Sequence, residues 1–233
     1  MNLKSLNGVS CLKSVMTVSL ALLLSSPLAR ADWNFGLEGG TEINEGTENT
    51  RLRLRASNDG RPLSQLVYAE WRRDSDANNS YEIGYKPRFW FTDNAYLFGD
   101  GRFGVNGNLL IDQSRYLVGG VGYEPIRTDT TNVFAEIGAG AQEFDFESGT
   151  ETSEAIGVAR AVALHRPTDN VQLSAEIDAN RGEDVERADF EVGISLRIPT
   201  GSLRYSYRKQ WLRVDGGDLV EDDVAFFSYG FGF

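Results

Sequence analysis

The last ten residues of the chain decide its fold: Val224-Ala-Phe-Phe-Ser-Tyr-Gly-Phe-Gly-Phe233. Alternate side chains of a β-strand point to opposite faces, so one face of this segment carries Phe227, Tyr229, Phe231 and Phe233. A soluble protein rarely ends on such a face, because exposed aromatic strands promote aggregation. The outer side of a transmembrane barrel meets hydrocarbon and an aromatic girdle, and it requires this face. The segment favours an outer-membrane barrel over the last strand of a soluble sandwich or lipocalin-like barrel.

The opposite end of the chain predicts export. Lys4 and Lys13 lie in the first part of the chain, an apolar run covers residues 15–24, and Ala29-Arg-Ala31 follows. This order is typical of a secretory signal peptide, so we expect residues 1–31 to be cleaved after Sec-dependent export and residues 32–233 to form the barrel. The single cysteine, Cys11, lies within the signal. The exported chain therefore offers no thiol for a disulfide, a metal or catalysis.

Composition restricts the class of protein further. The whole chain has a net charge of −11, and cleavage removes three basic residues and no acidic one, so the exported chain is more acidic still. Such a chain does not bind nucleic acid by neutralising phosphates. The mean hydropathy is −0.33, and no long apolar segment is present outside the signal. A membrane protein with these properties has to be a β-barrel, since alternating strands dilute hydropathy.

Alternation of apolar and polar residues recurs twelve times along the exported chain. The clearest case is 49–57, where Leu52 and Leu54 alternate with arginines. The sequence therefore predicts an all-β fold: a single antiparallel transmembrane β-barrel of about 12 strands, with both termini in the periplasm because the count is even. Pro87 predicts a local defect in its strand. The expected strands are 33–42, 49–57, 63–72, 81–91, 95–105, 114–124, 132–142, 152–164 (the least regular), 171–180, 187–198, 202–213 and 224–233.

The connections between these segments divide into two kinds. A Thr-Asp pair recurs at 92–93, 128–129 and 168–169, within short segments that have the composition of tight turns. The intervals of 36 and 40 residues correspond to one strand-turn-strand-loop cycle. We assign these turns to the periplasmic end and the longer, mostly acidic connections to the outer end.

Several motifs resemble a known family. They are Phe89-Trp-Phe-Thr-Asp-Asn-Ala-Tyr-Leu-Phe-Gly99, the glycine-rich strand 116–123, Ala135-Glu-Ile-Gly-Ala-Gly140 and the Ser-Tyr-Gly of the last strand. Together they resemble the YdiY-like family of putative salt-induced outer-membrane proteins, whose function is uncharacterised. More loosely, the chain is similar to small twelve-stranded acid-sugar porins. The aromatic C-terminus also resembles the signal that the barrel-assembly machinery recognises. The resemblance implies a fold and a location among outer-membrane lipids and lipopolysaccharide, but no catalytic residue.

The side chains expected to face the lumen are strongly charged. Basic residues gather on the second to fifth and the eleventh expected strands, and acidic residues on the seventh to tenth, so walls of opposite sign would face each other. Such walls tune selectivity in porins and favour a narrow passive channel for small solutes or ions with a mixed-charge lumen. Alternatively the charges pair across the lumen and fill it, giving a plugged, mainly structural or stress-related barrel. The candidate lumen residues are Arg51, Arg53, Arg55, Lys86, Arg88, Arg102, Glu136, Glu176, Asp178, Glu191, Arg204 and Arg208.

An enzyme is the third class and the one least favoured. Outer-membrane hydrolases need a histidine beside a serine or aspartate, because the base activates serine or water. The single histidine, His165, falls in an expected periplasmic turn, 165–170. Neighbouring carboxylates such as Glu176 and Asp178 are explained as lumen charges. We therefore expect no catalytic residue, no cofactor and no metal site.

Overall fold

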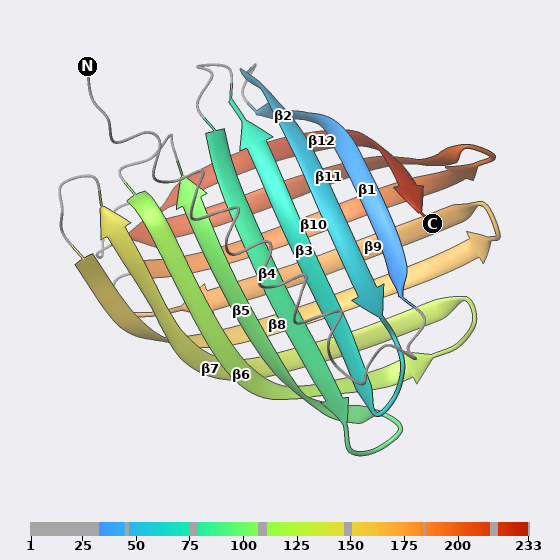
Figure 1. Cartoon of the computed structure of the whole chain (residues 1–233), viewed down its shortest axis with the longest axis horizontal. Coiled ribbons are helices and arrows are strands. Elements are labelled where there is room, and N and C mark those ends of the chain that lie inside the picture. The colour runs from blue at the N-terminus through green and yellow to red at the C-terminus, as the bar shows by residue number, and fades with distance from the viewer. Residues whose placement is uncertain are drawn as a thin grey trace. The chain divides into compact units, whose positions relative to one another are not determined.

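The structure, a computed structural model, describes residues 33–44, 47–74, 79–106, 111–146, 151–183, 185–214 and 219–232. These residues form one closed antiparallel barrel of twelve strands in which β1 pairs with β12 (Figure 1). The predicted all-β barrel is confirmed. The predicted signal peptide, residues 1–31, and Phe233 lie outside the described residues. The strands are β1 (Asn34–Asn44), β2 (Thr47–Asn58), β3 (Leu63–Arg73), β4 (Asn79–Trp90), β5 (Ala95–Asn106), β6 (Ile111–Arg127), β7 (Thr131–Phe146), β8 (Glu151–Thr168), β9 (Val171–Arg181), β10 (Val185–Ile198), β11 (Gly201–Val214) and β12 (Val220–Gly232).

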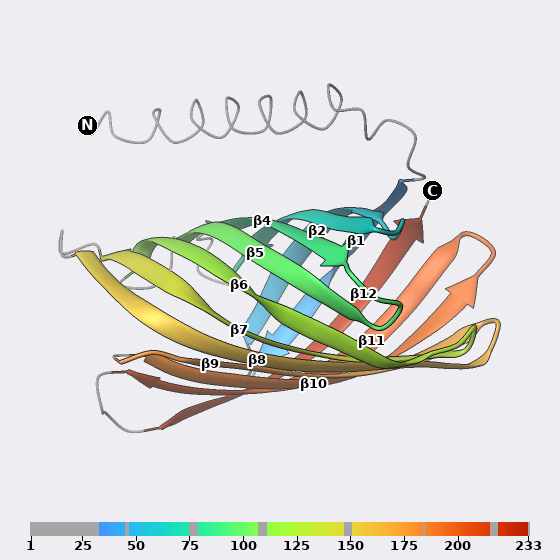
Figure 2. The same ribbon diagram turned by 90° about the horizontal axis from the view of Figure 1, so that it is seen from below.

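Strands that follow one another in the chain are also neighbours in the barrel. In Figures 1 and 2 the strands of one side cross those of the other at a steep angle, as the tilt of barrel strands requires. The first residues of β1 pair with the last of β12 and with the end of β2 that precedes the turn at 59–62. Both ends of the barrel chain therefore lie at the end that carries the short turns. No helix among the described residues is long and apolar enough to cross a membrane.

The recurring Thr-Asp pairs mark equivalent hairpins at this end. The carbonyls of Asn94, Thr130 and Asn170, the residues that close these turns, accept backbone N–H bonds from the next strand but one. Their donors are Glu124, Arg166 and Arg197, and each bond is 2.7 Å long. The regular intervals seen in the sequence thus reflect one hairpin unit repeated along the barrel, with the turn extending the ladder to the neighbouring hairpin.

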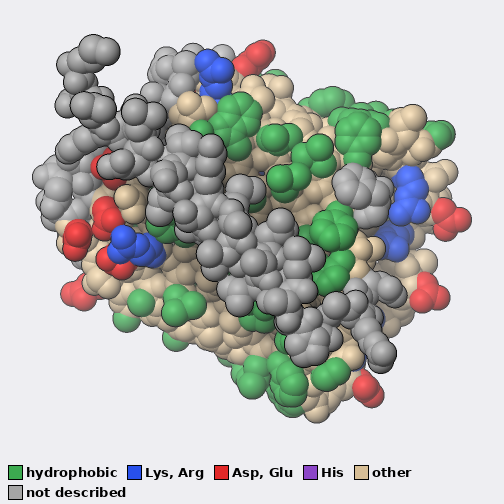
Figure 3. Space-filling model, viewed as in Figure 1, with side chains coloured by type: hydrophobic (Ala, Val, Ile, Leu, Met, Phe, Trp, Pro, Cys, Tyr) green, Lys and Arg blue, Asp and Glu red, His purple; other side chains and the backbone are tan. Residues whose placement is uncertain are grey.

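The outer face of the barrel is apolar and the inner face is charged. Leu117 and Ile137 are 70% and 63% exposed on the outside, and Phe227 and Phe231 of β12 are about half exposed on the same face. In the view of Figure 3, hydrophobic side chains spread over the middle of the face, and Lys, Arg, Asp and Glu lie toward its edges. This distribution is what hydrocarbon flanked by two polar interfaces selects.

β8 differs from the sequence-based expectation, whereas the irregularity predicted in β4 is present. β8 is longer than the predicted 152–164 and includes His165, which was expected in a turn, because a register shift between His165 and Thr168 lets the strand continue. The β4–β5 pairing omits Lys86 and Pro87, since proline has no N–H to donate. The predicted defect at Pro87 is confirmed as an interruption of the ladder.

Candidate functional site: the charged lumen

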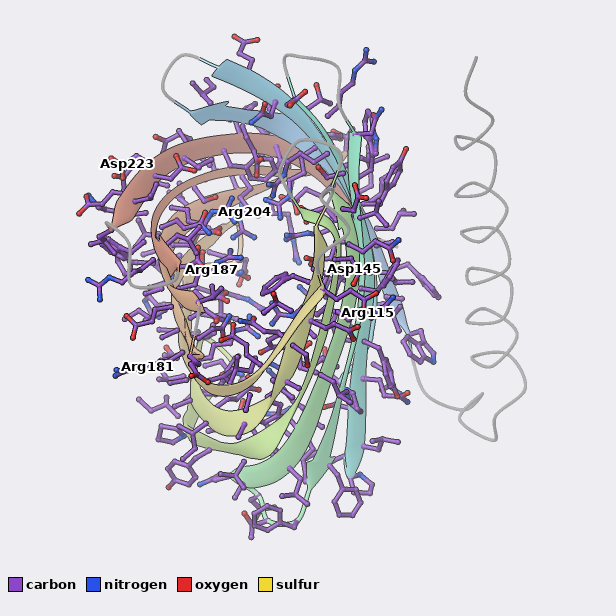
Figure 4. The ribbon with its side chains drawn as sticks, turned by 90° about the vertical axis from the view of Figure 1, so that its left-hand side faces the viewer. Arg115, Asp145, Arg181, Arg187, Arg204 and Asp223 are labelled. Carbon is purple, nitrogen blue, oxygen red and sulfur yellow. The ribbon has the colours of Figure 1, made fainter. Side chains whose placement is uncertain are left out.

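The strand registers place every charged candidate residue on the inner face. Arg53, for example, lies opposite Glu38 of β1 and Glu70 of β3, and Arg208 lies opposite Glu191. Figure 4 looks in from the loop end: Arg187 and Arg204 point into the barrel, whereas Arg181 and Asp223 point away from it. The twelve candidates share this inner face, and all of them except Arg55 take part in three groups that differ in packing.

The first group is centred on Glu136 of β7, and we call it the Glu136 cluster. The Glu136 carboxylate accepts bonds from Lys86 Nζ at 2.5 Å, the Arg88 guanidinium at 2.9 Å and Tyr96 Oη at 3.0 Å. Asp100 and Arg160 complete the cluster: Asp100 Oδ2 lies 3.9 Å from Lys86 Nζ, and Arg160 NH1 lies 4.0 Å from Glu136. Side-chain exposure is only 2% for Glu136 and 5% for Lys86. These charges are therefore buried and multiply paired, as charges out of water must be.

Glycine on β6 and β7 makes this packing possible. A Cβ on Gly122 would overlap the Tyr96 ring, and one on Gly120 or Gly138 would press on the Phe98 ring. Without side chains at these positions, the two rings lie against the wall and bury the aliphatic part of the cluster; Tyr96 is fully buried. A small, partly open cavity of about 10 Å³ remains beside the cluster. It is lined by Lys86, Phe98, Asp100, Arg102, Tyr116, Glu136, Val158, Ala159, Arg160 and Asp178.

The second group surrounds Glu42 of β1, and we call it the Glu42 cluster. Glu42 is 3% exposed and lies 2.9 Å from Arg51, 3.1 Å from Arg72 and 3.5 Å from Arg208. Glu70 of β3 joins it, since its carboxylate lies 2.6 Å from Arg51. The strands that meet here, β1, β2, β3 and β11, include both sides of the β1–β12 closure. The cluster therefore ties the first strands to the last ones inside the lumen.

The third group lies on the inner face of β9–β11, and we call it the open wall. Glu176 lies directly opposite Glu191, and Asp178 opposite Asp189, an arrangement of like charges that would be destabilising alone. Arginines offset the repulsion at N···O distances of 2.7 Å: Arg160 with Glu176, Arg187 with Asp189 and Arg204 with Glu191. These side chains are partly exposed inside the barrel, for example 43% for Arg187 and 33% for Arg204. Water therefore contacts the open wall.

The sequence-based prediction missed Arg160. It also predicted one wholly basic and one wholly acidic wall, whereas each wall carries charges of both signs. Arg160 lies on β8, where the alternation is weakest, although Ala159 and Ala161 on either side of it are outward. Glu42, Glu70 and Asp100 stand among the arginines of the supposed basic wall, and Arg160 and Arg187 among the acids of the other. The expectation of segregated walls is therefore wrong for the described residues. Each group carries both signs because a buried charge needs a partner of opposite sign nearby.

A group of three carboxylates and the single histidine lie on the outside of the barrel, away from the lumen. Glu143, Asp145 and Glu151, at the ends of β7 and β8 opposite the short turns, have carboxylate oxygens within 4.8 Å of one another. Arg115 of β6 forms ion pairs with two of them, at 2.7 Å and 3.4 Å, and is labelled beside Asp145 in Figure 4. His165 faces outward, exposed, with Nδ1 3.0 Å from Thr131 Oγ1.

Solved structures of small barrels resemble this fold. The NanC porin matches with a TM-score of 0.60 at 9% identity, over 84% of this chain and 98% of the porin. The KdgM porin matches with a TM-score of 0.56 at 10% identity, over 85% and 99%. The COG4313 outer-membrane channel from Pseudomonas putida F1 matches with a TM-score of 0.51 at 10% identity, over 86% and 94%. No curated protein matches the chain significantly.

These neighbours share the fold of the chain. The resemblance to an uncharacterised family, and more loosely to twelve-stranded porins, is confirmed. The model of the family described as "Protein of unknown function, DUF481" matches residues 34–231, and the chain belongs to that family.

Proposed function

We propose that the protein is a narrow passive channel for small solutes or ions, with a mixed-charge lumen. The twelve predicted residues would line it, together with Arg160, Arg187 and Asp189. The path would run along the open wall and the neighbouring part of β2, past the two buried clusters. Because each cluster occupies part of the cross-section, the pore would be narrower than those of sixteen-stranded porins.

The observation that carries this proposal is the exposure of charged side chains inside the barrel. Arg53 and Arg204 are 34% and 33% exposed although both point inward, whereas Glu136 on the other side of the lumen is 2% exposed. A lumen filled by ion pairs would bury both sides alike. Partly exposed charges beside the two buried clusters support a wet path along the lumen.

The same proposal includes the protein's orientation and assembly. We propose that both termini are periplasmic, which the even strand number and the short turns at the terminal end support. Sec-dependent export would precede insertion by the barrel-assembly machinery, with Phe227, Tyr229 and Phe231 as the outward-facing part of the signal and Phe233 completing it. Lipopolysaccharide would surround the outer ends of the strands, where Arg115 and its acidic partners face outward.

Single-channel recording tests the channel. The full gene product, extracted from outer membranes and shown to be folded by its heat-dependent mobility on gels, would be added to planar bilayers. We expect discrete conductance steps below those of sixteen-stranded porins measured in the same salt. Proteoliposome swelling would then give the size limit for neutral sugars.

A plugged, mainly structural barrel is the second candidate, and the two buried clusters favour it. Lys86 of β4 with Glu136 of β7, and Arg208 of β11 with Glu42 of β1, link strands that are not neighbours in the barrel. A folded barrel that gives no steps and no swelling would establish this alternative and refute the channel.

A further inference from the structure

We propose that Arg55 is the anion-binding residue of the lumen and that it recognises small oxyanions, carboxylates or phosphates, on their way through the barrel. The inference deepens the proposed function, since it names the class of solute, and it rests on that function for its physiological meaning. It begins from a difference between Arg55 and the other lumen-facing cations.

Most lumen-facing cations have a carboxylate partner within 4.0 Å. Lys86 and Arg88 bind Glu136, and Arg204 binds Glu191. Among the lumen-facing arginines and lysines that the structure describes, Arg55 takes part in no ion pair and no side-chain hydrogen bond, and it shares this state with Arg197, beside the β10–β11 turn. Arg55 points inward, opposite Gly36 of β1 and Tyr68 of β3, and is exposed to water. A guanidinium without a partner has five N–H donors free for a ligand.

Three carboxylates on the wall near Arg55 are already engaged, and the nearby Asp59, in the adjacent turn, forms no ion pair with it. Glu70 binds Arg51, Arg53 and Arg72. Glu38 accepts a bond from Ser228 at 2.5 Å, and Glu82 one from Tyr68 at 2.7 Å. A change of rotamer at Arg55 would therefore compete with existing bonds to reach these three acids on the wall.

Charges of both signs act on Arg55. Asp59 in the adjacent turn makes the largest charge contribution and attracts it, whereas Arg53, Arg88 and Arg160 repel it. Several cations around a water-filled space lower the energy of an anion placed there. Arginine suits an oxyanion, because its planar fork matches two oxygens of a carboxylate or phosphate.

The space beside Arg55 is open. Its cross-strand partner on β1 is Gly36, and a Cβ at that position would meet only the Phe231 carbonyl oxygen, at an ordinary 3.6 Å. Position 36 therefore accepts a side chain that projects into the lumen next to Arg55. This gives a test in which Arg55 stays in place and receives an internal partner.

The test compares the wild type with Arg55→Gln, Gly36→Asp and Gly36→Asn. Block of the chloride current by citrate, and separately by inorganic phosphate, would be titrated in bilayers. Each anion's effect on the melting temperature of the detergent-solubilised barrel would be measured in parallel. We expect the half-blocking concentration to rise at least tenfold in Arg55→Gln and Gly36→Asp and to stay near the wild-type value in Gly36→Asn. An effect from citrate alone would identify carboxylates as the class, and one from phosphate alone would identify phosphates.

The two readouts separate this proposal from the channel. A silent bilayer together with an Arg55-dependent rise in melting temperature would refute the channel and retain the site. Equal block and equal stabilisation in all four proteins would overturn the site while leaving the channel in place. If Arg55→Gln does not fold, the pair Gly36→Asp and Gly36→Asn decides, because these variants are nearly equal in size and differ in charge.

Discussion

The Glu136 cluster and the open wall are built from the same ion-pair chemistry but differ in access to water. Glu136 is 2% exposed and lies within 4.0 Å of three cations and a tyrosine hydroxyl. Glu191 is 26% exposed and has Arg204, 33% exposed, as its close partner at 2.7 Å. Burial strengthens each electrostatic contact and raises the cost of a missing one. The comparison teaches that charge on the packed side stabilises the fold, whereas charge on the wet side remains available to a solute.

Removal of the Glu136 charge should give the largest effect on stability. In Glu136→Gln the buried Lys86 loses its 2.5 Å partner and retains only Asp100, at 3.9 Å. We expect the free energy of unfolding to fall by roughly 3–5 kcal/mol, the cost of leaving a buried charge unpaired. Urea titration of the barrel in lipid vesicles, followed by tryptophan fluorescence, measures this.

A double variant sharpens the same comparison. Lys86→Met combined with Glu136→Gln should be less destabilised than the sum of the two single variants, because neither half of the pair remains unsatisfied. Recovery will be partial, since Arg88 and Arg160 also lie within 4.0 Å of Glu136. Strict additivity would contradict the assignment of the cluster as a coupled unit.

The next largest effect on stability is expected from two glycines of the barrel wall near the Glu136 cluster, one packed against neighbouring backbone and one facing outward. A Cβ on Gly140 would overlap the Leu117 carbonyl oxygen and touch Val118, whereas a Cβ on the outward Gly157 would meet nothing within 4 Å. We expect Gly140→Ala to lose about 1–3 kcal/mol through overpacking. Gly157→Ala should gain about 0.4–1 kcal/mol by restricting the unfolded chain. The same unfolding assay measures both, and a loss in Gly157→Ala would show that close packing extends to the lipid face.

The sequence was sufficient for the barrel, because a period of two fixes which residues face inward once one strand is placed. Thus Arg51, Arg53 and Arg55 were assigned to the inner face from the leucines between them. The sequence was insufficient to predict which of the inward charges are buried and which are exposed in the lumen. Which inward charges are buried depends on strands that are remote in the chain, as with Lys86 and Glu136, 50 residues apart. The freedom of Arg55 depends on glycine at its cross-strand position and on acids that other residues have bound, which no local pattern records.

The smallest change in stability should occur on the open wall, where selectivity responds instead. Glu191→Gln and Arg204→Gln each remove one half of a partly exposed pair, so the free energy of unfolding should change by about 0–1 kcal/mol. Glu191→Gln leaves Arg204 uncompensated and should shift the reversal potential in a potassium chloride gradient toward anions. Arg204→Gln should shift it toward cations, and the double variant should return to the wild-type value. Because only charges beside the ion path act on passing ions, opposite shifts at nearly constant stability would place this pair on the path. A large loss of stability without a shift would instead assign the open wall the same structural role as the Glu136 cluster.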